Sequence, residues 1–520
     1  MPDQYVMAID AGTGSCRAIL FNRDGDQVAT HQEEWSHRSL PEYPGSQVFD
    51  TKSNWELISK CIRGAISNAS AEPSDVKGVS ATSMREGMVL YDEAGKEIWA
   101  CPNVDSRATK EAAGLIRSGA AKRIFREGGD WVSITAPPRF LWIRKNQPDV
   151  FRRIGHVGML SDWILYRLSD KFATDPSVGS SSGMFDLGKR RWSKRTAELC
   201  GLEPDIFPEV MEPGSTLGEV TQRAAEETGL REGTPVVLGG ADTQLGLIGM
   251  GTSEKGEAAV VGGSFWQTTI ALDRPLIDGK MRLRSLCHAY PGMWMMEGIG
   301  FYSGLTLRWF RDGFCESEKE EAKRRGVDPY VLMEELASRV PPGSNGVLGI
   351  FGNIMDSKRW VHASPSLLQF RVGDPANSGK KESIRAIEES AAYVVQGHLR
   401  IIESITGRRM GSIMFAGGGS KGKVWPQIIA DVLGIDVKIP LVKESTSLGC
   451  AICAGTGTGW YDDLRSGSKE LSRVERTLSP NATNHEAYLE LYKRWAKVYA
   501  RSLAMAEDGL LEPLWWPAGA

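Results

Sequence analysis

The feature that most constrains the fold of this chain is an apolar strand that ends in a glycine-rich turn, because it occurs twice. At the N-terminus, an apolar run leads to Asp10, the turn Gly12-Thr13-Gly14-Ser15 follows, and a second apolar run contains Arg17. Within residues 258–272, the turn Gly262-Gly263-Ser264 stands between two apolar runs in the same way. Each pattern predicts a β-hairpin with a tight turn.

The chemistry of these turns favours anion binding. Glycine allows backbone N–H groups to approach an anion closely, and the hydroxyl groups of Thr13 and Ser15 are further donors. Asp10 ends its strand where a hydrated cation could bridge it to a phosphate group. An ordinary hairpin with small residues in its turn is the alternative for the N-terminal element, because short glycine motifs recur by chance.

Three further stretches of the chain could line the same kind of site. An apolar run leads to Gly239-Gly240-Ala241-Asp242 at the start of a predicted helix. Another leads to Gly417-Gly418-Gly419-Ser420-Lys421, followed by a helical pattern at 425–434. Residues 444–455 are mostly small and predict a helix that packs closely under a nucleotide. Together with the two hairpins, these stretches predict a nucleotide-phosphate site.

Bulk properties exclude several functional classes. A chain of 520 residues predicts more than one domain. The net charge of −3 argues against nucleic acid or an anionic membrane as the main partner. No apolar run approaches the roughly 20 residues of a spanning helix, and the N-terminus lacks the features of a signal peptide, so we expect a cytoplasmic protein.

Cysteine and histidine spacing indicates neither a disulfide framework nor a zinc site. The eight cysteines are scattered, and the seven histidines form no His-x-x-x-His pair. Cys450-Ala-Ile-Cys453 has redox-like spacing, but its small apolar surroundings favour a buried helix. Helical spacing also predicts helices at 55–66 and 486–499, whereas the charged stretch 466–479 predicts a surface excursion.

The order of these motifs resembles that of the FGGY carbohydrate kinases over nearly the whole chain. Further shared segments are Ser83-Met84-Arg85-Glu86-Gly87, Asn103-Val104-Asp105-Ser106-Arg107, Ser161-Asp162-Trp163 and the run from Gly304 to Asp312. The resemblance implies an α/β protein in which two actin-like (RNase-H-like) ATPase domains flank a catalytic cleft. We place the domains at 1–252 and 253–520, with a hinge near the glycine-bearing segment 251–256.

The resemblance also implies ATP and Mg²⁺ as cofactors and assigns roles to residues. Asp242 is the expected general base, and Asp10 and Asp242 are the expected metal-binding carboxylates; a helix N-cap is the alternative for Asp242. The expected nucleotide-binding residues are Asp10, Thr13, Gly14, Ser15, Arg17, Gly263, Ser264, Gly417, Gly418, Gly419, Ser420 and Lys421. The expected substrate-binding residues are Met84, Arg85, Glu86, Asp105, Asp162, Trp266 and Phe301, of which the apolar ones suit a small substrate with an apolar end. Structural Arg–carboxylate pairs are the alternative for the charged ones.

One near-match to another nucleotide motif needs separate treatment. Residues 417–424 almost spell the P-loop sequence, which requires Ser or Thr after its Lys to bind magnesium. Val424 follows Lys423 and cannot serve. We therefore interpret this segment as the adenosine and α-phosphate site that the actin-like fold implies, in which Lys421 either neutralises phosphate charge or is simply solvated.

Other functions stay open at this level. Another kinase of the same family, acting on a ketopentose, glycerol or a tetritol, is the first alternative, and a non-catalytic nucleotide switch or sugar sensor is the second. An intact Asp242 disfavours the sensor, since binding alone needs no base. Residues 351–360 depart from the usual family pattern. The resemblance also implies a regulatory phosphotransferase-system protein as partner, and it leaves the oligomeric state open.

Overall fold

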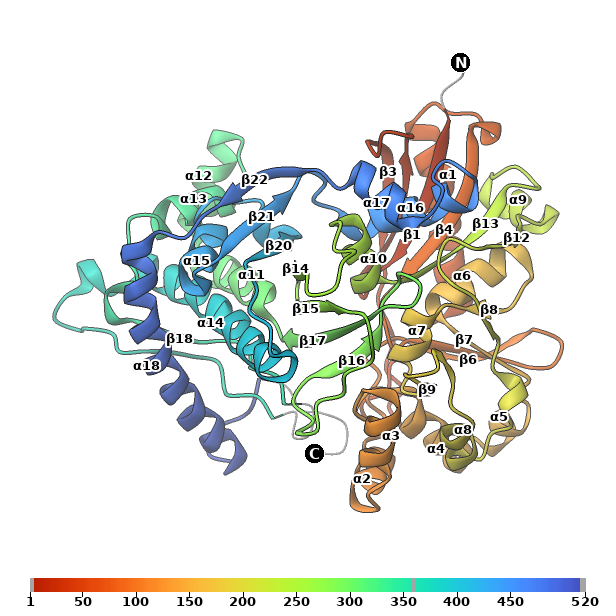
Figure 1. Cartoon of the computed structure of the whole chain (residues 1–520), viewed down its shortest axis with the longest axis horizontal. Coiled ribbons are helices and arrows are strands. Elements are labelled where there is room, and N and C mark those ends of the chain that lie inside the picture. The colour runs from red at the N-terminus through yellow and green to blue at the C-terminus, as the bar shows by residue number, and fades with distance from the viewer. Residues whose placement is uncertain (1–3, 357–360, 515–520) are drawn as a thin grey trace.

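Two sheet-centred halves lie side by side, with helices packed around each sheet (Figure 1). The structure is a computed structural model that describes residues 4–356 and 361–514. Part of the divergent segment 351–360 thus lies outside the described residues. Within the described part of the chain, no helix combines the length and the apolar character that crossing a membrane requires. The α/β class and the paired-sheet architecture agree with the sequence-based prediction.

The first sheet has six strands in the order β12-β13-β4-β1-β2-β3. Its strands are β1 (Tyr5–Ala11), β2 (Ser15–Phe21), β3 (Gln27–Glu34), β4 (Val76–Ser83), β12 (Thr216–Glu219) and β13 (Pro235–Ala241). β1 and β2 form the predicted hairpin, and β1, β4 and β13 run parallel. Every residue of β1 is buried, as a near-continuous apolar strand covered on both faces requires.

The second sheet has seven strands in the order β16-β17-β15-β14-β20-β21-β22. Its strands are β14 (Ala258–Gly262), β15 (Trp266–Leu272), β16 (Arg284–Cys287), β17 (Trp294–Gly300), β20 (Ser412–Ala416), β21 (Asp436–Pro440) and β22 (Val474–Leu478). β14 and β15 form the second predicted hairpin, and β14, β20 and β21 run parallel. In both halves, three antiparallel strands are therefore followed by two parallel strands. The chain thus contains an internal structural repeat.

Smaller sheets and helices complete each half. The minor strands are β5 (Met88–Tyr91), β6 (Glu97–Cys101), β7 (His156–Met159), β8 (Ala173–Thr174), β9 (Phe185–Asp186), β10 (Arg191–Trp192), β11 (Glu209–Val210), β18 (Leu348–Ile350) and β19 (Ser366–Leu368). The helices before residue 250 are α1 (Thr51–Asn68), α2 (Thr109–Arg117), α3 (Ala120–Gly128), α4 (Ala136–Asn146), α5 (Pro148–Arg152), α6 (Leu160–Ser169), α7 (Pro176–Ser181), α8 (Lys194–Cys200), α9 (Gln222–Thr228) and α10 (Asp242–Gly249). Those after it are α11 (Ser303–Phe314), α12 (Glu316–Arg325), α13 (Pro329–Ala337), α14 (Lys380–Thr406), α15 (Val424–Leu433), α16 (Ser445–Gly457), α17 (Leu464–Leu471) and α18 (Ala482–Glu507).

The stretch 466–479 is not the surface excursion that its charge predicts. It contains most of α17 and the strand β22, which extends the second sheet at its edge. Ser468 and Leu471 of α17 are buried, because the apolar side of this short helix packs against α16. The charged residues of the stretch occupy the other faces. Composition alone therefore did not indicate that α17 is an amphipathic helix.

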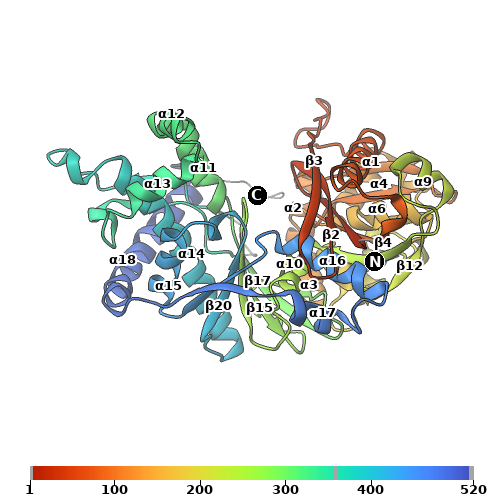
Figure 2. The same ribbon diagram turned by 90° about the horizontal axis from the view of Figure 1, so that it is seen from above.

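Helices α10 and α16 cross between the two halves at backbone contact distance (Figure 2). A Cβ atom built on Gly249 would stand 2.0 Å from the Ser445 carbonyl oxygen, and one on Gly449 would stand 1.9 Å from that of Leu245. Only glycine allows so close a crossing. α16 also packs on β1, β4 and β13, so a helix from late in the chain covers the first sheet (Figure 1).

The second sheet reaches back towards the first half through β16. The amide of Ser285 in β16 donates a hydrogen bond to the carbonyl oxygen of Gly129 at 2.8 Å. Gly129 directly follows α3. Both α16 and β16 therefore join the halves across the predicted boundary between residues 252 and 253. That boundary and the hinge at 251–256 remain predictions.

The helix crossing yields a test of stability. Gly449→Ala should destabilise the fold by about 1–3 kcal/mol, because the added methyl group collides with backbone that cannot rotate away. Chemical unfolding followed by circular dichroism measures the change. Gly114→Ala in α2 is the matched control, since its Cβ would meet nothing within 4 Å, and it should be neutral or slightly stabilising. Equal effects of the two substitutions would refute the close crossing.

Candidate active site

The parallel strands bring three predicted residues to one edge of the first sheet. Ala11, Ser83 and Ala241 are register partners at the carboxyl ends of β1, β4 and β13. Asp10 directly precedes Ala11, and Arg85 and Asp242 follow Ser83 and Ala241 by two residues and one residue. The three are far apart in the sequence. Residues at the carboxyl ends of adjacent parallel strands share one edge, which is where α/β proteins build their sites.

Asp242 is the first residue of α10 and lies next to the guanidinium group of Arg85. Asp242 Oδ1 is 3.7 Å from Arg85 Nε and accepts a hydrogen bond from the Thr243 amide at 2.6 Å. Removal from water raises the pKa of Asp242 to about 6; Arg85 opposes the rise, while the carboxylates of Asp10 and Glu86 add to it. The side chain still keeps 38% of its surface accessible, so a ligand can reach this carboxyl group.

Asp10 is the more enclosed of the two carboxylates and is held by Arg17 across the first hairpin. Arg17 Nε and Nη2 donate to Asp10 Oδ2 at 2.9 and 2.7 Å. Arg17 Nη1 also forms an ion pair with Glu444 Oε2 at 2.8 Å, and Glu444 is the residue that precedes α16. The carboxylates of Asp10 and Glu444 raise the pKa of Arg17, although burial opposes them. Arg17 thus connects the first hairpin to the helix that crosses α10.

A buried charge network links two of the predicted substrate residues, Arg85 and Glu86, to the second sheet. Arg85 Nη1 donates to Glu297 Oε2 at 2.9 Å, and Arg284 Nη2 donates to Glu86 Oε1 at 2.8 Å. The same Arg284 nitrogen lies 2.6 Å from Asp130 Oδ2. All five side chains are at most 6% exposed, so each charge depends on its partners rather than on water.

Two backbone features fix this network in place. Glu86 has a φ of 62°, an uncommon conformation for a residue with a side chain. The guanidinium group of Arg139 donates to the Glu86 carbonyl oxygen and, through Nη2, to the carbonyl oxygens of 102, 103 and 105. Burial also raises the pKa of Asp130 to about 6, with Arg284 opposing and Glu86 adding to the rise.

Sequence reasoning missed Asp130, Arg284 and Glu297 as members of this site. Glu297 lies inside the otherwise apolar strand β17, and its register partner Arg284 is the first residue of β16. A single charged residue inside an otherwise apolar strand is the signal that could have identified Glu297, since such a charge is rarely buried without a partner. Arg284 follows Arg282 by two residues and gives no such signal. Asp130 follows two glycines and carries no comparable signal.

The two hairpin turns present exposed residues at the tips of their sheets. Thr13 and Gly14 of the first turn and Gly263 and Ser264 of the second are exposed. Gly417 and Gly304 pack against the second hairpin so closely that an added Cβ would lie 2.5 Å from the Gly262 oxygen and 2.1 Å from the Gly263 oxygen. The Gly417-Gly418-Gly419 turn is therefore adjacent to the second hairpin, as the parallel pairing of β14 and β20 requires.

A cavity of about 550 Å³ opens beside these glycines in the second half. Its lining includes most of the predicted nucleotide residues of that half: Gly263, Ser264, Gly418, Gly419 and Lys421. α11 and α13 contribute Leu307, Val331 and Met333, and Trp425 and Glu388 complete the wall. Ser420 is buried and donates to the Gly417 carbonyl oxygen at 2.8 Å, which shapes the turn. An apolar cavity with a glycine wall has the form of a nucleoside site.

Other predicted substrate residues have partners within the protein. Asp105 accepts hydrogen bonds from Arg107 Nε at 2.7 Å and from the Gln47 amide at 2.8 Å, which is the structural pair given above as the alternative. Asp162 accepts from the Met159 amide at 2.9 Å at the start of its own helix, and burial raises its pKa. Asp105 Oδ1 is buried without a hydrogen-bond partner in the described part of the chain and lies 4.0 Å from Arg139 Nε. The role of Asp105 and Asp162 in substrate binding remains a prediction.

The predicted apolar substrate residues are enclosed as well. Trp266 is 1% exposed and packs between Phe415 and Trp425, with ring centroids 5.0 and 4.7 Å away. It therefore supports the glycine turn from below and offers a substrate no accessible surface. Phe301 and Met84 are also buried, at 7% and 2%. Trp266 and Phe301 therefore lie in the core of the second half, and their role in substrate binding remains a prediction.

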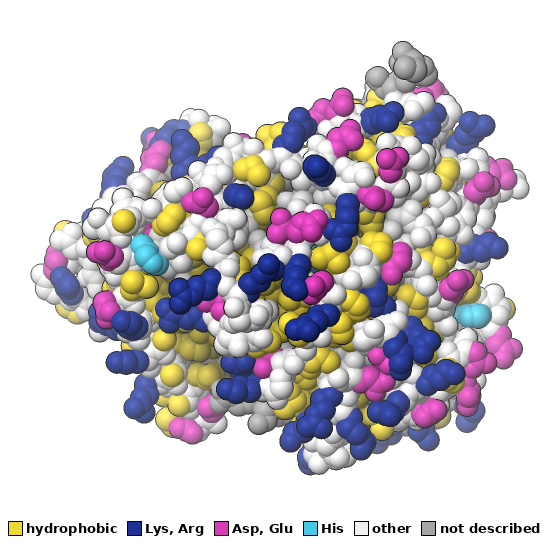
Figure 3. Space-filling model, viewed as in Figure 1, with side chains coloured by type: hydrophobic (Ala, Val, Ile, Leu, Met, Phe, Trp, Pro, Cys, Tyr) yellow, Lys and Arg dark blue, Asp and Glu magenta, His cyan; other side chains and the backbone are white. Residues whose placement is uncertain are grey.

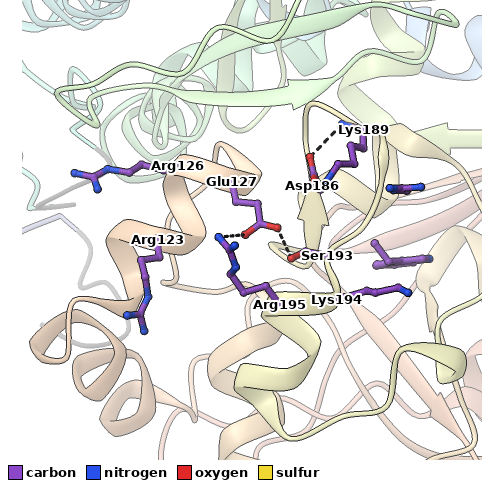
Figure 4. Close-up of a pocket in the computed structure, with 10 residues that line it drawn as sticks. Arg123, Arg126, Glu127, Asp186, Lys189, Ser193, Lys194 and Arg195 are labelled. Carbon is purple, nitrogen blue, oxygen red and sulfur yellow. Dashed lines mark hydrogen bonds and ion pairs between the residues drawn. The ribbon is translucent and has the colours of Figure 1, made fainter.

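A second hollow, of about 710 Å³, lies in the first half between α3, β10 and α8. Lys and Arg side chains gather over this part of the molecule (Figure 3). Its two carboxylates are already paired: Glu127 accepts from Ser193 Oγ at 2.6 Å and Asp186 from Lys189 at 2.6 Å (Figure 4). The basic side chains around it are exposed to solvent, and we assign this hollow no part in the chemistry described above.

The two related sheets, each with an exposed hairpin turn at the end of its parallel strands, define a protein of the actin-like ATPase fold class. Solved structures of this class are similar over almost their whole length. Gluconate kinase from Lactobacillus acidophilus superposes with a TM-score of 0.84 at 17% identity, covering 97% of this chain and 99% of that one. Xylulose kinase from Rhodospirillum rubrum gives 0.82 at 24% identity, covering 96% and 99%.

Sequence comparison identifies the family. The N-terminal domain of the FGGY family of carbohydrate kinases matches residues 5–249, and its C-terminal domain matches 266–458. The chain is also 45% identical over 518 residues to a protein named autoinducer-2 kinase from Yersinia enterocolitica, with 99% of this chain and 98% of the relative covered. A protein of the same name from Klebsiella pneumoniae is 44% identical, with 99% and 97% covered. The chain belongs to the FGGY family of carbohydrate kinases, which implies ATP as the phosphoryl donor and a small molecule as the acceptor.

The buried network gives a second test of stability. Arg284→Met should cost about 3–5 kcal/mol of unfolding free energy, because it leaves the carboxylates of Glu86, Asp130 and Glu297 without their shared partner. The loss should be largest at neutral pH and smaller in acid, where the carboxylates take up protons. Denaturant titration at two pH values measures both effects.

A matched control replaces a cation whose ion pair is exposed. Lys255 pairs with Asp273 at 2.7 Å, and both side chains are about half exposed. Lys255→Met should change stability little. If Arg284→Met proved equally harmless, the network would not hold the two halves together.

Proposed function

We propose that this protein transfers the γ-phosphoryl group of ATP to the primary hydroxyl of the linear autoinducer-2 precursor, 4,5-dihydroxy-2,3-pentanedione. The observation that carries the proposal is the juxtaposition of an accessible carboxyl group, Asp242, with the buried guanidinium of Arg85 at the edge that also holds Asp10. The named relatives support the choice of substrate, because two of them at 44–45% identity carry the name autoinducer-2 kinase.

Asp242 is the proposed general base. Phosphoryl transfer needs alignment and charge neutralisation more than covalent help, together with a group that accepts the proton of the attacking hydroxyl. With a pKa of about 6, Asp242 is ionised at neutral pH yet more basic than an ordinary aspartate. Its orientation is fixed because the Thr446 hydroxyl donates to its backbone carbonyl oxygen at 3.1 Å and the Thr243 amide to its carboxylate.

The two hairpin turns are the proposed phosphate walls, and the cavity of the second half is the proposed nucleoside site. Thr13, Gly14 and Ser15 would donate to the transferred phosphate from one side, and Gly263 and Ser264 from the other. Gly417, Gly418 and Gly419 would lie against the adenosine, with Ser420 shaping the turn, and Lys421 and Arg17 would add positive charge. Asp242 and the primary hydroxyl would meet the γ-phosphate between these walls.

The donor set fits Mg²⁺. Two carboxylates, Asp10 and Asp242, lie close enough that the first raises the pKa of the second. No group of three or more metal-binding side chains occurs among residues 4–356 and 361–514. Mg²⁺ commonly takes one or two carboxylates and completes its shell with phosphate oxygens and water. When bound, Mg²⁺ would neutralise phosphate charge. Asp10 and Asp242 are the carboxylates that would hold it.

Arg85 and Glu86 are the proposed substrate contacts. Arg85 supplies donors for the two carbonyl or hydroxyl oxygens of the substrate, and Glu86 supplies an acceptor. Since both residues are already held by Glu297 and Arg284 across the two halves, substrate would bind to groups whose positions are set in advance. We also propose a cytoplasmic location, from the absence of signal-peptide features in the sequence, and a phosphotransferase-system protein as a regulatory partner, on the family resemblance alone.

The proposed base leads to a test in solution. Asp242→Asn should keep ATP affinity but lower kcat by roughly 100- to 10,000-fold, because the amide preserves shape and loses the proton acceptor. A coupled assay of ADP release gives kcat, and calorimetry gives the affinity for ATP. The matched control is Asp50→Asn, which caps α1 through the Ser53 amide and should leave turnover unchanged.

The pH profile separates a base from a merely structural aspartate. In the wild-type protein, log kcat/KM should decline as the pH falls below about 6, because the base becomes protonated. Near-normal turnover of a clean Asp242→Asn preparation would refute the assignment.

The proposed substrate leads to a competition between alcohols. The dihydroxy-pentanedione should exceed xylulose, ribulose and glycerol in kcat/KM by at least about tenfold, because a pocket built to hydrogen-bond its ligand leaves polar groups unpaired when another ligand enters. Arg85→Ala, once shown to be folded, should lower kcat/KM for that substrate and leave ATP affinity almost unchanged.

The same assay covers the alternatives. A better rate with a ketopentose or glycerol would keep the family assignment and overturn the substrate. The absence of turnover with every alcohol, together with intact ATP binding, would favour the non-catalytic sensor.

A further inference from the structure

The nucleoside cavity contains three carboxyl groups, and two of them have structural duties. Asp328 is the N-cap of α13 and accepts from the Tyr330 amide at 2.9 Å. Glu334 accepts hydrogen bonds from the Val424 amide at 2.6 Å and from the Lys423 amide. Its carboxylate thereby caps the start of α15. Both carboxylates satisfy backbone groups that would otherwise lack partners. Their presence in the wall therefore needs no ligand to explain it.

Glu388 of α14 is different. Its residue is 3% exposed, and its Oε2 atom is buried without a hydrogen-bond partner in the described part of the chain. Its backbone is fixed, because Trp425 Nε1 donates to the Glu388 carbonyl oxygen at 3.0 Å. A buried polar atom without a partner costs free energy, so an unpartnered carboxyl group in a cavity wall points to a ligand that completes it.

The neighbouring residue shows what a structural glutamate looks like here. Glu389 accepts from the Gly343 amide at 2.9 Å, the Ser344 hydroxyl at 3.0 Å and the Tyr488 hydroxyl at 2.8 Å. Arg385, the nearest cation on the same helix, donates to Glu389 at 3.2 Å and to Tyr488 at 2.8 Å. The local network is therefore completed by Glu389 and leaves Glu388 out.

The surroundings of Glu388 are those of a heteroaromatic base. Leu307, Met333 and Trp425 provide apolar surface in the same cavity, and the backbone of Gly418 and Gly419 provides a flat wall. Phosphate donors lie at the hairpin turn, Gly263 and Ser264, in another part of the lining. A base that stacks on the apolar part would bring its polar edge to the one carboxyl group that is not already engaged.

We propose that Glu388 is the residue that selects adenine, accepting a hydrogen bond from its 6-amino group and donating one to the adjacent ring nitrogen. This inference rests on the proposed function, since it assigns the base specificity of the same nucleotide site. Adenine places a donor beside an acceptor on the edge formed by its 6-amino group and N7, whereas guanine places two acceptors there. A protonated carboxyl group offers one acceptor and one donor and so complements adenine alone on that edge.

The protonated form is the one that burial favours. Removal from water raises the pKa of Glu388 to about 8; the carboxylates of Glu334 and Glu389 add to the rise, and Arg385 opposes it. The other ionisable groups in the cavity wall are Arg308, Asp328, Tyr330 and Lys421. At neutral pH, Glu388 therefore carries a hydroxyl donor, and it loses this donor as the pH rises above about 8.

The test is nucleotide binding without an acceptor alcohol, measured by calorimetry with the magnesium complexes of ATP, GTP and purine riboside triphosphate, which lacks the 6-amino group. The wild-type protein should prefer ATP to both analogues by about tenfold or more. Glu388→Gln keeps one donor and one acceptor, so it should retain the preference. Glu388→Leu should bind ATP about ten- to a hundredfold more weakly and lose the preference, with no loss of thermal stability, because the replaced group had no partner.

Two controls make the result decisive. Glu389→Gln, one residue away, should lower the melting temperature and keep the preference for ATP. In wild-type protein the ATP affinity should fall as the pH rises from 7 to 9, and in Glu388→Gln it should not. This pH comparison decides the matter even if Glu388→Leu does not fold.

The outcomes separate this inference from the proposed function. ATP binding by Glu388→Leu with unchanged affinity and preference would overturn the role of Glu388 alone. A wild-type protein that binds no nucleotide would overturn the proposed function itself.

Discussion

The rest of the structure depends on the contact between α10 and α16. Gly249 and Gly449 let the two helix backbones meet, and no side chain separates them. α10 begins with Asp242, and Thr446 of α16 donates to the Asp242 carbonyl oxygen, so the crossing sets where the carboxyl group stands. The residue before α16, Glu444, also pairs with Arg17. One helix pair thereby fixes the proposed base, the first hairpin and the packing of late residues on the first sheet.

Electrostatics join the halves at a second place. Arg85 and Glu86 lie on the first half, and Glu297 and Arg284 lie on strands of the second. Burial of such charges costs several kcal/mol each unless every one is paired, so the network tolerates little rearrangement once formed. The same pairs hold the positive φ of Glu86. The proposed substrate contacts, Arg85 and Glu86, are therefore positioned by residues of the opposite half, which couples the integrity of the site to the association of the halves.

Much of this arrangement was predictable from local patterns, and the part that was not has a physical reason. The two hairpins, the helix that begins at Asp242 and the helices around 55–66 and 486–499 follow from periodicity and turn chemistry, which act over a few residues. The substrate role of Trp266, which is 1% exposed, stays a prediction, because apolar character in a sequence does not tell whether a side chain faces a ligand or the core. Arg284 and Glu297 were missed because their significance lies in partners about 200 residues away. The amphipathic α17 was hidden by its charged faces.

The repeat explains why the two halves have different chemistry on the same scaffold. Both place a hairpin turn and the end of a parallel strand at one edge, so both offer backbone donors to phosphate. In the first half, carboxylates stand at the ends of β1 and β13. In the second half, Gly263 and Ser264 follow β14 and Gly417 follows β20. The cavity beside them combines apolar side chains with the charged groups of Arg308, Asp328, Glu334, Glu388 and Lys421. In the proposed reaction, proton transfer needs a carboxylate that water can reach, whereas the nucleotide base needs an enclosed apolar wall. The duplicated sheet would supply these two environments on opposite sides of the phosphate chain.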